Sequence, residues 1–253
     1  MGQIVLTSKS SLLLLLVSIP GVLLQRQESS SHPPLRPAEA QIYQPALQPS
    51  ESIPPIGTYM LRNQAGEPCV KVTLGVEYIV VEKMKSWYFS MDPTRVGTSG
   101  YCTNNLAVLS LMLPHSSAGL QFTFMKEKKT FYVQQLEAHI SPQPICEKCA
   151  NKTYVGLLAQ KKLFVTSDGQ SFKCASETLL VLSPQLKIKL VPLQMQAFSL
   201  PRGAYGTELE CWADYNKRVI PIVIGAVVVG LLLIAMLTFL FIKDRRTQDY
   251  ERL

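Results

Sequence analysis

Short runs of alternating apolar and polar residues fill the middle of the chain. Leu120, Phe122 and Phe124 alternate with polar residues, which is the period of a half-buried β-strand. Residues 130–140 resume the alternation after a lysine-rich turn, so the two runs predict a β-hairpin. Further strands are expected at residues 77–81, 87–91, 106–113, 163–166, 171–174 and 185–190. Because no sustained helical period interrupts these runs, we expect an all-β domain of two or three packed antiparallel sheets.

A second hairpin is predicted around a short polar turn. Residues 163–166 and 171–174 flank Asp168-Gly169, a dipeptide typical of tight β-turns. We therefore expect these two strands to pair with each other.

Two longer apolar runs lie outside this β-rich region. The first, residues 11–24, is short and follows Lys9, so residues 1–24 are interpreted as a secretory signal peptide. An uncleaved anchor helix is the alternative, although a membrane span needs about 20 apolar residues. The second run, residues 219–242, carries no charged residue and is long enough to cross a bilayer. With the N-terminal part delivered to the lumen, the chain is expected to be a type I single-pass membrane protein with a cytoplasmic tail of residues 243–253.

The segment before the β-rich region has a different composition. Residues 25–55 are rich in proline, serine and glutamine and poor in apolar side chains. Such a segment cannot bury enough apolar surface to offset its ordering entropy, so we expect an extended linker. The luminal domain is then expected to cover residues 56–218.

The formal net charge of the chain is +7. A nucleic-acid-binding protein concentrates such charge on one face or tract. Here the basic residues are spread over the luminal region, and the densest cluster, Lys126, Lys128 and Lys129, surrounds Glu127 at a predicted hairpin tip. Solvated lysines on loops and strand faces account for this pattern. We therefore expect no nucleic-acid partner. The membrane is expected as a partner because of the apolar run at residues 219–242.

All six cysteines lie in the expected luminal domain. An even number of cysteines in an oxidising compartment predicts disulfides. The spacing suggests two loops of comparable length, with an isolated C-x-x-C motif between them: Cys69 with Cys102, Cys174 with Cys211, and Cys146 to Cys149 as the motif. For the motif a structural disulfide is favoured, redox chemistry is the first alternative, and metal binding ranks below both. A zinc site would need a second ligand pair at similar spacing, which the sequence lacks, so no metal is expected.

Two short motifs point to modification and sorting. Asn151-Lys152-Thr153 is an N-glycosylation sequon, and we expect Asn151 to carry a glycan. The tail contains Tyr250-x-x-Leu253, the pattern of an endocytic and lysosomal sorting signal. Such a peptide adds an extended strand to a clathrin adaptor complex and places Tyr250 and Leu253 in two apolar pockets. An incidental Tyr–Leu pair is the alternative.

Catalytic motifs are missing from the sequence. There is no Gly-x-Ser-x-Gly, no metal-spaced histidine pair and no phosphate-binding loop. The three histidines, His32, His115 and His139, are placed in the linker, in a loop and near a strand end. We therefore expect no enzymatic activity, no catalytic residue and no cofactor.

Several motifs occur together in the order found in one family. The chain resembles the lysosome-associated membrane glycoproteins, a family that includes macrosialin and the dendritic-cell lysosomal glycoprotein. The resemblance rests on these segments: Gly57-Thr-Tyr59, Cys69-Val-Lys-Val, Tyr88-Phe-Ser-Met-Asp-Pro93, Gly100-Tyr-Cys102, Leu120-Gln-Phe-Thr-Phe124, Gly169-Gln-Ser-Phe-Lys-Cys174 and Glu210-Cys211. It implies a disulfide-stapled β-prism with the same two long-range cysteine pairs, followed by one transmembrane helix and a sorting tail that contacts clathrin adaptors.

The resemblance also implies a role. Family members are sorted glycoproteins of endosome and lysosome membranes that protect the membrane, help vesicle fusion or escort other membrane proteins, and they are not enzymes. Asp249 stands where the family usually has glycine, so cycling through the plasma membrane is expected as well. The alternative function is a cell-surface recognition or adhesion receptor whose β domain binds a protein or glycan. A partner helix could approach at Ala226-x-x-x-Gly230, so an unidentified luminal or transmembrane protein partner is expected.

Overall fold

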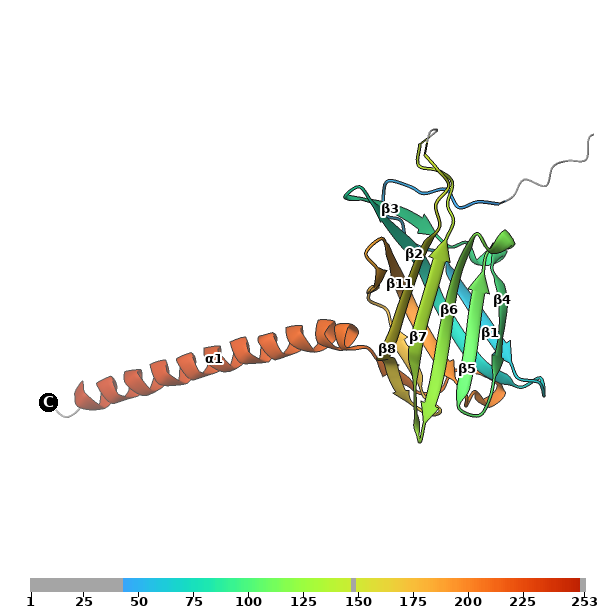
Figure 1. The fold of residues 1–253 in the computed structure, drawn as a ribbon. Helices are drawn as coiled ribbons and strands as arrows, with labels where there is room; N and C mark the ends of the chain where they lie inside the picture. Colours follow the sequence, from blue (N-terminus) through green and yellow to red (C-terminus); the bar gives the residue numbers. More distant parts are fainter. Residues whose placement is uncertain (1–42, 147–148, 251–253) are drawn as a thin grey trace, which may run out of the picture. The chain divides into compact units, whose positions relative to one another are not determined.

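The alternating runs form the strands of two β-sheets that enclose an apolar core (Figure 1). The computed structural model describes residues 43–146 and 149–250. The strands of the seven-stranded sheet are β1 (Ile56–Arg62), β2 (Pro68–Glu82), β3 (Lys85–Ser90), β9 (Ser171–Cys174), β10 (Thr178–Ser183), β11 (Leu186–Ala197) and β12 (Glu208–Glu210). Those of the five-stranded sheet are β4 (Gly97–Cys102), β5 (Leu106–Met112), β6 (Ala118–Glu127), β7 (Thr130–Ile140) and β8 (Tyr154–Ser167).

The long strands β2 and β11 form the centre of the seven-stranded sheet. One half of β2 pairs with β1 and the other half with β3, while β11 pairs along most of its length with β2 and also with β9 and β10. The five-stranded sheet has the simple order β4-β5-β6-β7-β8. The expected all-β architecture is confirmed, although β9 and β12 pair in parallel rather than antiparallel.

The core consists of the inward faces of both sheets. Leu120, Phe122 and Phe124 on β6 are at most 1% exposed, as their alternation predicts. The predicted hairpin of β6 and β7 is confirmed, with Glu127 opposite Thr130 at its tip. Full burial of such side chains stabilises the fold by about 1.5–3 kcal/mol each.

The second predicted hairpin is wrong. The Asp168-Gly169 turn exists, with Gly169 at a φ of +81°, but β8 pairs with β7 whereas β9 pairs with β11 and β12. The turn therefore carries the chain from one sheet to the other. Phe164 and Phe172 pack together with ring centroids 5.1 Å apart, which joins the two strands through side chains instead of backbone hydrogen bonds.

Part of the expected linker is attached to the β domain. Tyr43 and Leu47 pack against the core, and Gln48 forms an antiparallel bridge with Tyr88 on β3. The contacts of the domain thus begin before residue 56. Composition alone does not predict them, because the proline-rich segment is held by backbone hydrogen bonds to β3. Residues 25–42 of the expected linker and the expected signal peptide, residues 1–24, lie outside the described residues.

One long α-helix follows the β domain. Helix α1 (Trp212–Tyr250) begins directly after Cys211, so it starts inside the range expected for the luminal domain. An 18-residue window within its segment Trp212–Lys243 has a mean hydropathy of 3.0, and among the described residues this is the one helix long and apolar enough to cross a membrane. Short 3₁₀ turns (η1 Pro93–Arg95, η2 Pro114–Ser116 and η3 Pro201–Gly203) connect strands elsewhere.

Candidate functional site

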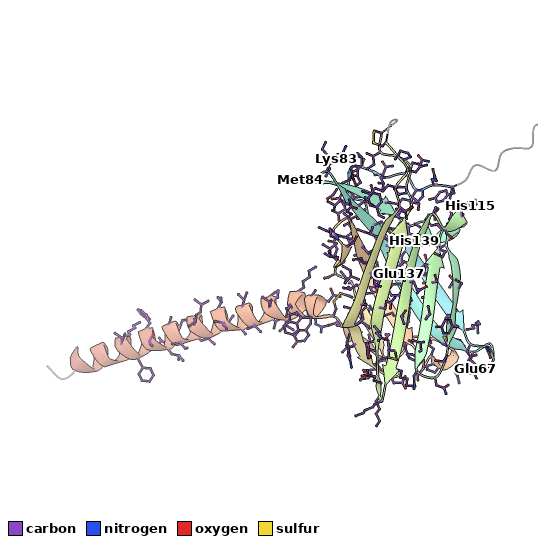
Figure 2. The ribbon with its side chains drawn as sticks, in the orientation of Figure 1. Glu67, Lys83, Met84, His115, Glu137 and His139 are labelled. Carbon is purple, nitrogen blue, oxygen red and sulfur yellow. A yellow bond between two sulfur atoms is a disulfide. The ribbon has the colours of Figure 1, made fainter. Side chains whose placement is uncertain are left out.

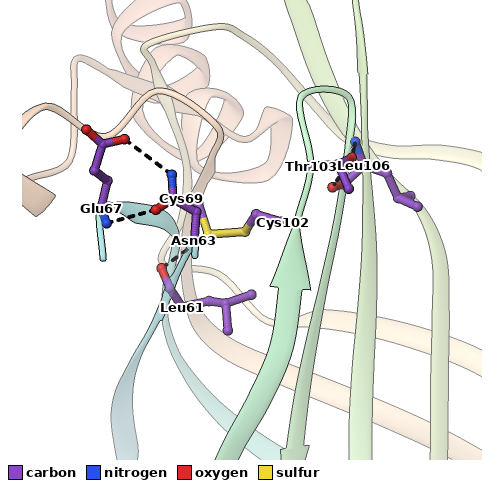
Figure 3. The surroundings of a disulfide bond; sticks show 7 residues. All are labelled: Leu61, Asn63, Glu67, Cys69, Cys102, Thr103 and Leu106. Carbon is purple, nitrogen blue, oxygen red and sulfur yellow. Dashed lines mark hydrogen bonds between the residues drawn. A yellow bond between two sulfur atoms is a disulfide. The ribbon is translucent and has the colours of Figure 1, made fainter. Parts of the chain in front are cut away.

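Two disulfides connect distant parts of the β domain. Cys69 on β2 is bonded to Cys102 at the end of β4, which links the two sheets, and Cys69 Sγ lies 3.4 Å from the carbonyl oxygen of Leu61 (Figure 3). Cys174 at the end of β9 is bonded to Cys211, directly before α1. These are the pairs that spacing and family resemblance suggest. By restricting the unfolded chain, each bridge contributes about 4 kcal/mol.

The Cys174–Cys211 bridge lies beside the start of the helix. The Asp214 carboxylate accepts hydrogen bonds from the backbone N–H groups of Ala175 and Ser176, at 2.5 and 2.9 Å. Burial raises the pKa of Asp214, but these hydrogen bonds outweigh it and hold the pKa below the ordinary value. Both sulfurs near Asp214 are consumed by the disulfide, so this cluster offers no thiolate to a metal.

The third disulfide, Cys146–Cys149, has different surroundings. It closes a turn in which the Cys149 N–H donates to the Cys146 carbonyl oxygen at 2.9 Å. Both cysteines are exposed, and they lie in the irregular segment between β7 and β8, as the flanking prolines predict. Because its two cysteines are only three positions apart, this bridge does not connect distant parts of the domain.

The predicted glycosylation site follows this disulfide. Asn151 lies three residues before the start of β8 and is exposed, so its side chain is accessible from solvent. The Thr153 hydroxyl shares a hydrogen bond of 2.8 Å with that of Ser141, and Lys152 Nζ lies 2.8 Å from the Glu82 carboxylate. The hydrogen bond and charge of Lys152 lower the pKa of Glu82 against a smaller opposing effect of desolvation. The Lys152–Glu82 contact attaches the sequon segment to the β2–β3 hairpin, and the Thr153–Ser141 hydrogen bond attaches it to the end of β7.

A cavity of about 490 Å³ lies between this segment and the β2–β3 hairpin. The hairpin contributes Trp87 and, at its tip, Lys83; Figure 2 shows Lys83 and Met84 at this end of the domain. The segment between β7 and β8 contributes prolines, Ile145, both cysteines and Asn151. The lining of the cavity is therefore largely apolar and also includes charged side chains. Sequence patterns gave no sign of this cavity, because it joins residues far apart in the chain.

A buried ion pair on the seven-stranded sheet was also missed. Glu77 on β2 is fully buried, and Lys189 on β11 is 4% exposed. Lys189 Nζ lies 2.5 Å from Glu77 Oε2 and also pairs with Glu51 in the segment before β1, while Ser52 N–H donates to Glu77 Oε1 at 2.7 Å. Desolvation lowers the pKa of Lys189, but hydrogen bonds to the two carboxylates outweigh it and raise the pKa. This network holds the incoming chain against the sheet.

Aromatic residues mark the start of α1. Trp212 is 74% exposed and stacks on Tyr215, with ring centroids 5.8 Å apart. Aromatic rings at the end of an apolar span are typical of membrane–water interfaces. The signal was present in the sequence, since Trp212 and Tyr215 lie one helical turn apart just before the basic pair Lys217-Arg218.

The predicted sorting residues lie at and beyond the end of the helix. Helix α1 includes Tyr250 as its last residue, and Leu253 lies outside the described residues. The contact of Tyr250 and Leu253 with an adaptor therefore stays a prediction.

Comparisons with known proteins agree with this architecture. Residues 44–212 match the family model of lysosome-associated membrane glycoprotein 2-like luminal domains. Lysosome-associated membrane glycoprotein 3 from Homo sapiens is 32% identical over 83% of this chain and 49% of its own length, and lysosome-associated membrane glycoprotein 2 from Mus musculus is 26% identical over 78% and 46%. The chain thus spans about half the length of these curated relatives.

Solved structures match the β domain. The crystal structure of the human lysosome-associated membrane protein LAMP-3 aligns with a TM-score of 0.57 and 28% identity, covering 62% of this chain and 99% of that one. The membrane-proximal domain of mouse LAMP-1 has the same fold, with a TM-score of 0.55 at 20% identity and coverage of 64% and 99%. From the family match, the identity and the shared fold, this chain belongs to the lysosome-associated membrane glycoprotein family, with one C-terminal transmembrane helix.

Proposed function

We propose that the protein is a type I single-pass glycoprotein of endosome and lysosome membranes, sorted by its Tyr-x-x-Leu tail and without enzymatic activity. The observation that carries the proposal is the order of its parts: a lysosome-associated membrane glycoprotein domain over residues 44–212 leads directly into an apolar helix. Its role would be to protect the membrane, help vesicle fusion or escort a partner protein.

Several features support a luminal β domain. Three disulfides occur in it, and such bonds persist in oxidising compartments. The exposed sequon at Asn151 fits the same side of the membrane, because N-glycans are added in the lumen. On the other side of the apolar run, Lys243, Arg245 and Arg246 fit a cytoplasmic flank.

The tail supports recruitment of a clathrin adaptor complex. Adaptors bind such motifs as an extended strand, with the tyrosine and the bulky apolar residue in separate pockets. The helix would therefore have to end before Tyr250 in the complex, which frees Tyr250 and Leu253 to bind together. Asp249, beside the motif, is compatible with partial residence at the cell surface.

Sorting is tested by replacing the tyrosine in the full-length protein. Tyr250→Ala should move a tagged protein from endosomal puncta to the plasma membrane, measured by surface biotinylation and by co-localisation with lysosomal markers. Arg252→Ala, which changes a residue between the two anchors, is the matched control and should leave the distribution unchanged. An unchanged distribution of Tyr250→Ala would contradict the sorting proposal and favour a resident surface receptor.

Topology is tested independently through the sequon. Asn151→Gln should migrate faster than wild type on gels and lose its sensitivity to endoglycosidase. Asn104→Gln, which removes an asparagine outside any sequon, should migrate like the wild type. A wild-type chain insensitive to endoglycosidase would contradict the use of Asn151.

A further inference from the structure

The three disulfides differ sharply in their accessibility. Cys69, Cys174 and Cys211 are 6%, 3% and 8% exposed, and Cys102 is half-buried. Cys146 and Cys149 are both exposed. A disulfide is opened when a thiolate attacks one sulfur in line with the S–S bond, so access to the sulfur limits the rate. By this criterion only the Cys146–Cys149 bond is open to attack in the folded domain.

The three bonds also differ in what they connect. The buried pairs join residues 33 and 37 positions apart, whereas the exposed pair is separated by 3. The segment that carries the exposed pair has other attachments: Gln143 N–H donates to the Pro45 carbonyl oxygen, and Lys152 pairs with Glu82. Opening the Cys146–Cys149 bond therefore leaves the two sheets and these attachments in place. A bond of this kind can be broken and re-formed without unfolding the domain.

The exposed disulfide borders the 490 Å³ cavity described above. Figure 1 shows the segment between β7 and β8 at the same end of the domain as β3. Trp87, Ile145 and Tyr154 provide an apolar wall, and the charged residues of the lining are Glu82, Lys83, Lys85 and Lys152. An apolar wall of this size accepts side chains next to a bound residue. Since Lys152 pairs with Glu82, these charges leave the lining with an excess of positive charge, which favours the thiolate form of an incoming cysteine.

We propose that the Cys146–Cys149 disulfide and this cavity form a thiol-exchange site for cysteine-containing peptides that carry an aromatic or apolar residue beside the cysteine. The peptide thiolate attacks one sulfur, a peptide–protein disulfide forms, and the S–S bond between Cys146 and Cys149 breaks. Its electron pair leaves on the second cysteine, which takes up the proton lost by the peptide thiol. The second cysteine can reverse the step, or a second peptide thiol can displace the first as a peptide disulfide and leave both cysteines reduced. This inference goes beyond the sorting function and does not depend on it.

The test uses the oxidised full-length protein in detergent micelles. It is incubated with acetyl-Phe-Cys-Phe-amide or with acetyl-Gly-Cys-Gly-amide at equal thiolate concentration, and free cysteines are trapped with isotopically distinct alkylating reagents and counted by mass spectrometry. Cys146 and Cys149 should become labelled at least about tenfold faster than the four other cysteines. The Phe-flanked peptide should react faster than the Gly-flanked peptide. Trp87→Ala should remove that difference, and Trp87→Phe should retain it.

The buried cysteines provide an internal control for folding. If Trp87→Ala unfolded the domain, Cys69 and Cys102 would also become labelled, and the comparison then rests on Lys85→Ala, which should slow both peptides equally. In the wild type, labelling of all three cysteine pairs at equal rates would overturn the proposal. So would equal rates for the two peptides in the wild type, because the cavity would then contribute nothing to recognition.

Discussion

Replacing Lys189 by methionine would leave a buried carboxylate without its cation. Glu77 is fully buried and its carboxylate lies 2.5 Å from Lys189 Nζ, so water cannot replace the lost charge. Removing one member of such a pair costs about 3–5 kcal/mol. This is a large share of the roughly 5–15 kcal/mol by which a domain is stable. For a domain of this size it corresponds to a fall in Tm of about 6–20 °C.

The neighbouring carboxylate provides the matched control. Glu51 pairs with the same lysine, but its side chain is 52% exposed. Water screens such a charge, so Glu51→Gln should cost at most about 1 kcal/mol. The double variant Glu77→Gln/Lys189→Met removes both buried charges and keeps an amide oxygen that accepts from Ser52 N–H. It should therefore be more stable than Lys189→Met alone.

The assay is urea unfolding of the full-length protein in detergent micelles, followed by tryptophan fluorescence and near-UV circular dichroism at pH 7. The coupling energy between the two sites is obtained from the double-mutant cycle. A Lys189→Met variant within about 1 kcal/mol of the wild type would refute the reasoning, since it would show that the carboxylate is not buried in solution. Strict additivity of the two substitutions would refute it as well.

Three further predictions concern the β domain. Gly100 has a φ of +145°, and a Cβ there would overlap the carbonyl oxygen of Val108, so Gly100→Ala should lower the Tm. Gly66 lies in open space with a φ of +80°, so Gly66→Ala should lower the Tm less, through backbone strain alone. Removing the Cys69–Cys102 bridge by Cys→Ser at both positions should lower the free energy of unfolding by about 4 kcal/mol, measured by urea titration. An unchanged midpoint would show that closing this loop does not stabilise the domain. Burial raises the pKa of Asp168, but Lys126 together with hydrogen bonds from Ser199 and Gly169 outweighs it and holds the pKa below the ordinary value of 3.8. Its stabilisation is present above the unfolded pKa and lost as pH falls through the folded pKa, so Asp168→Asn should destabilise the domain equally at pH 7 and about pH 5, and the difference should shrink once the pH falls below the ordinary value of 3.8.

Local patterns predicted the features that depend on one stretch of chain. The alternation around Phe122 predicted a strand and its buried face, because side chains in a strand point to opposite sides in turn. The two long-range cysteine pairs followed from their spacing and from the family resemblance. The Asp168-Gly169 turn was also visible, but the partners of its strands were not. The turn residues determine only how the chain changes direction. The strands with which β8 and β9 pair, β7 and β11, lie elsewhere in the chain.

The buried polar groups and the cavity depend on contacts between distant segments, and no sequence window contains them. Glu77 and Lys189 each occupy an apolar strand, where a single charge suggests only a position facing solvent. They are instead directly opposite in the register of β2 and β11, which brings the charges together on one face. The segment before β1 then covers that face, because Glu51 and Ser52 complete the hydrogen bonds of the pair. Composition favours an extended linker here, but contacts of Glu51 and Ser52 with the buried ion pair hold this segment against the sheet.

The excess positive charge of the chain has a structural explanation in the β domain. Several lysines lie over aromatic rings: Lys71 over Tyr205 at 4.6 Å, Lys152 over Tyr154 at 4.8 Å, and Lys162 over Tyr132 at 4.7 Å. Lys152 and Lys162 also pair with carboxylates. Each such contact fixes a lysine stem against the outer face of a sheet and covers aromatic surface that water would otherwise meet. Each of these lysines therefore stabilises a sheet through its own contact. The number of lysines in the sequence does not by itself indicate a continuous positive surface that would attract an anionic polymer.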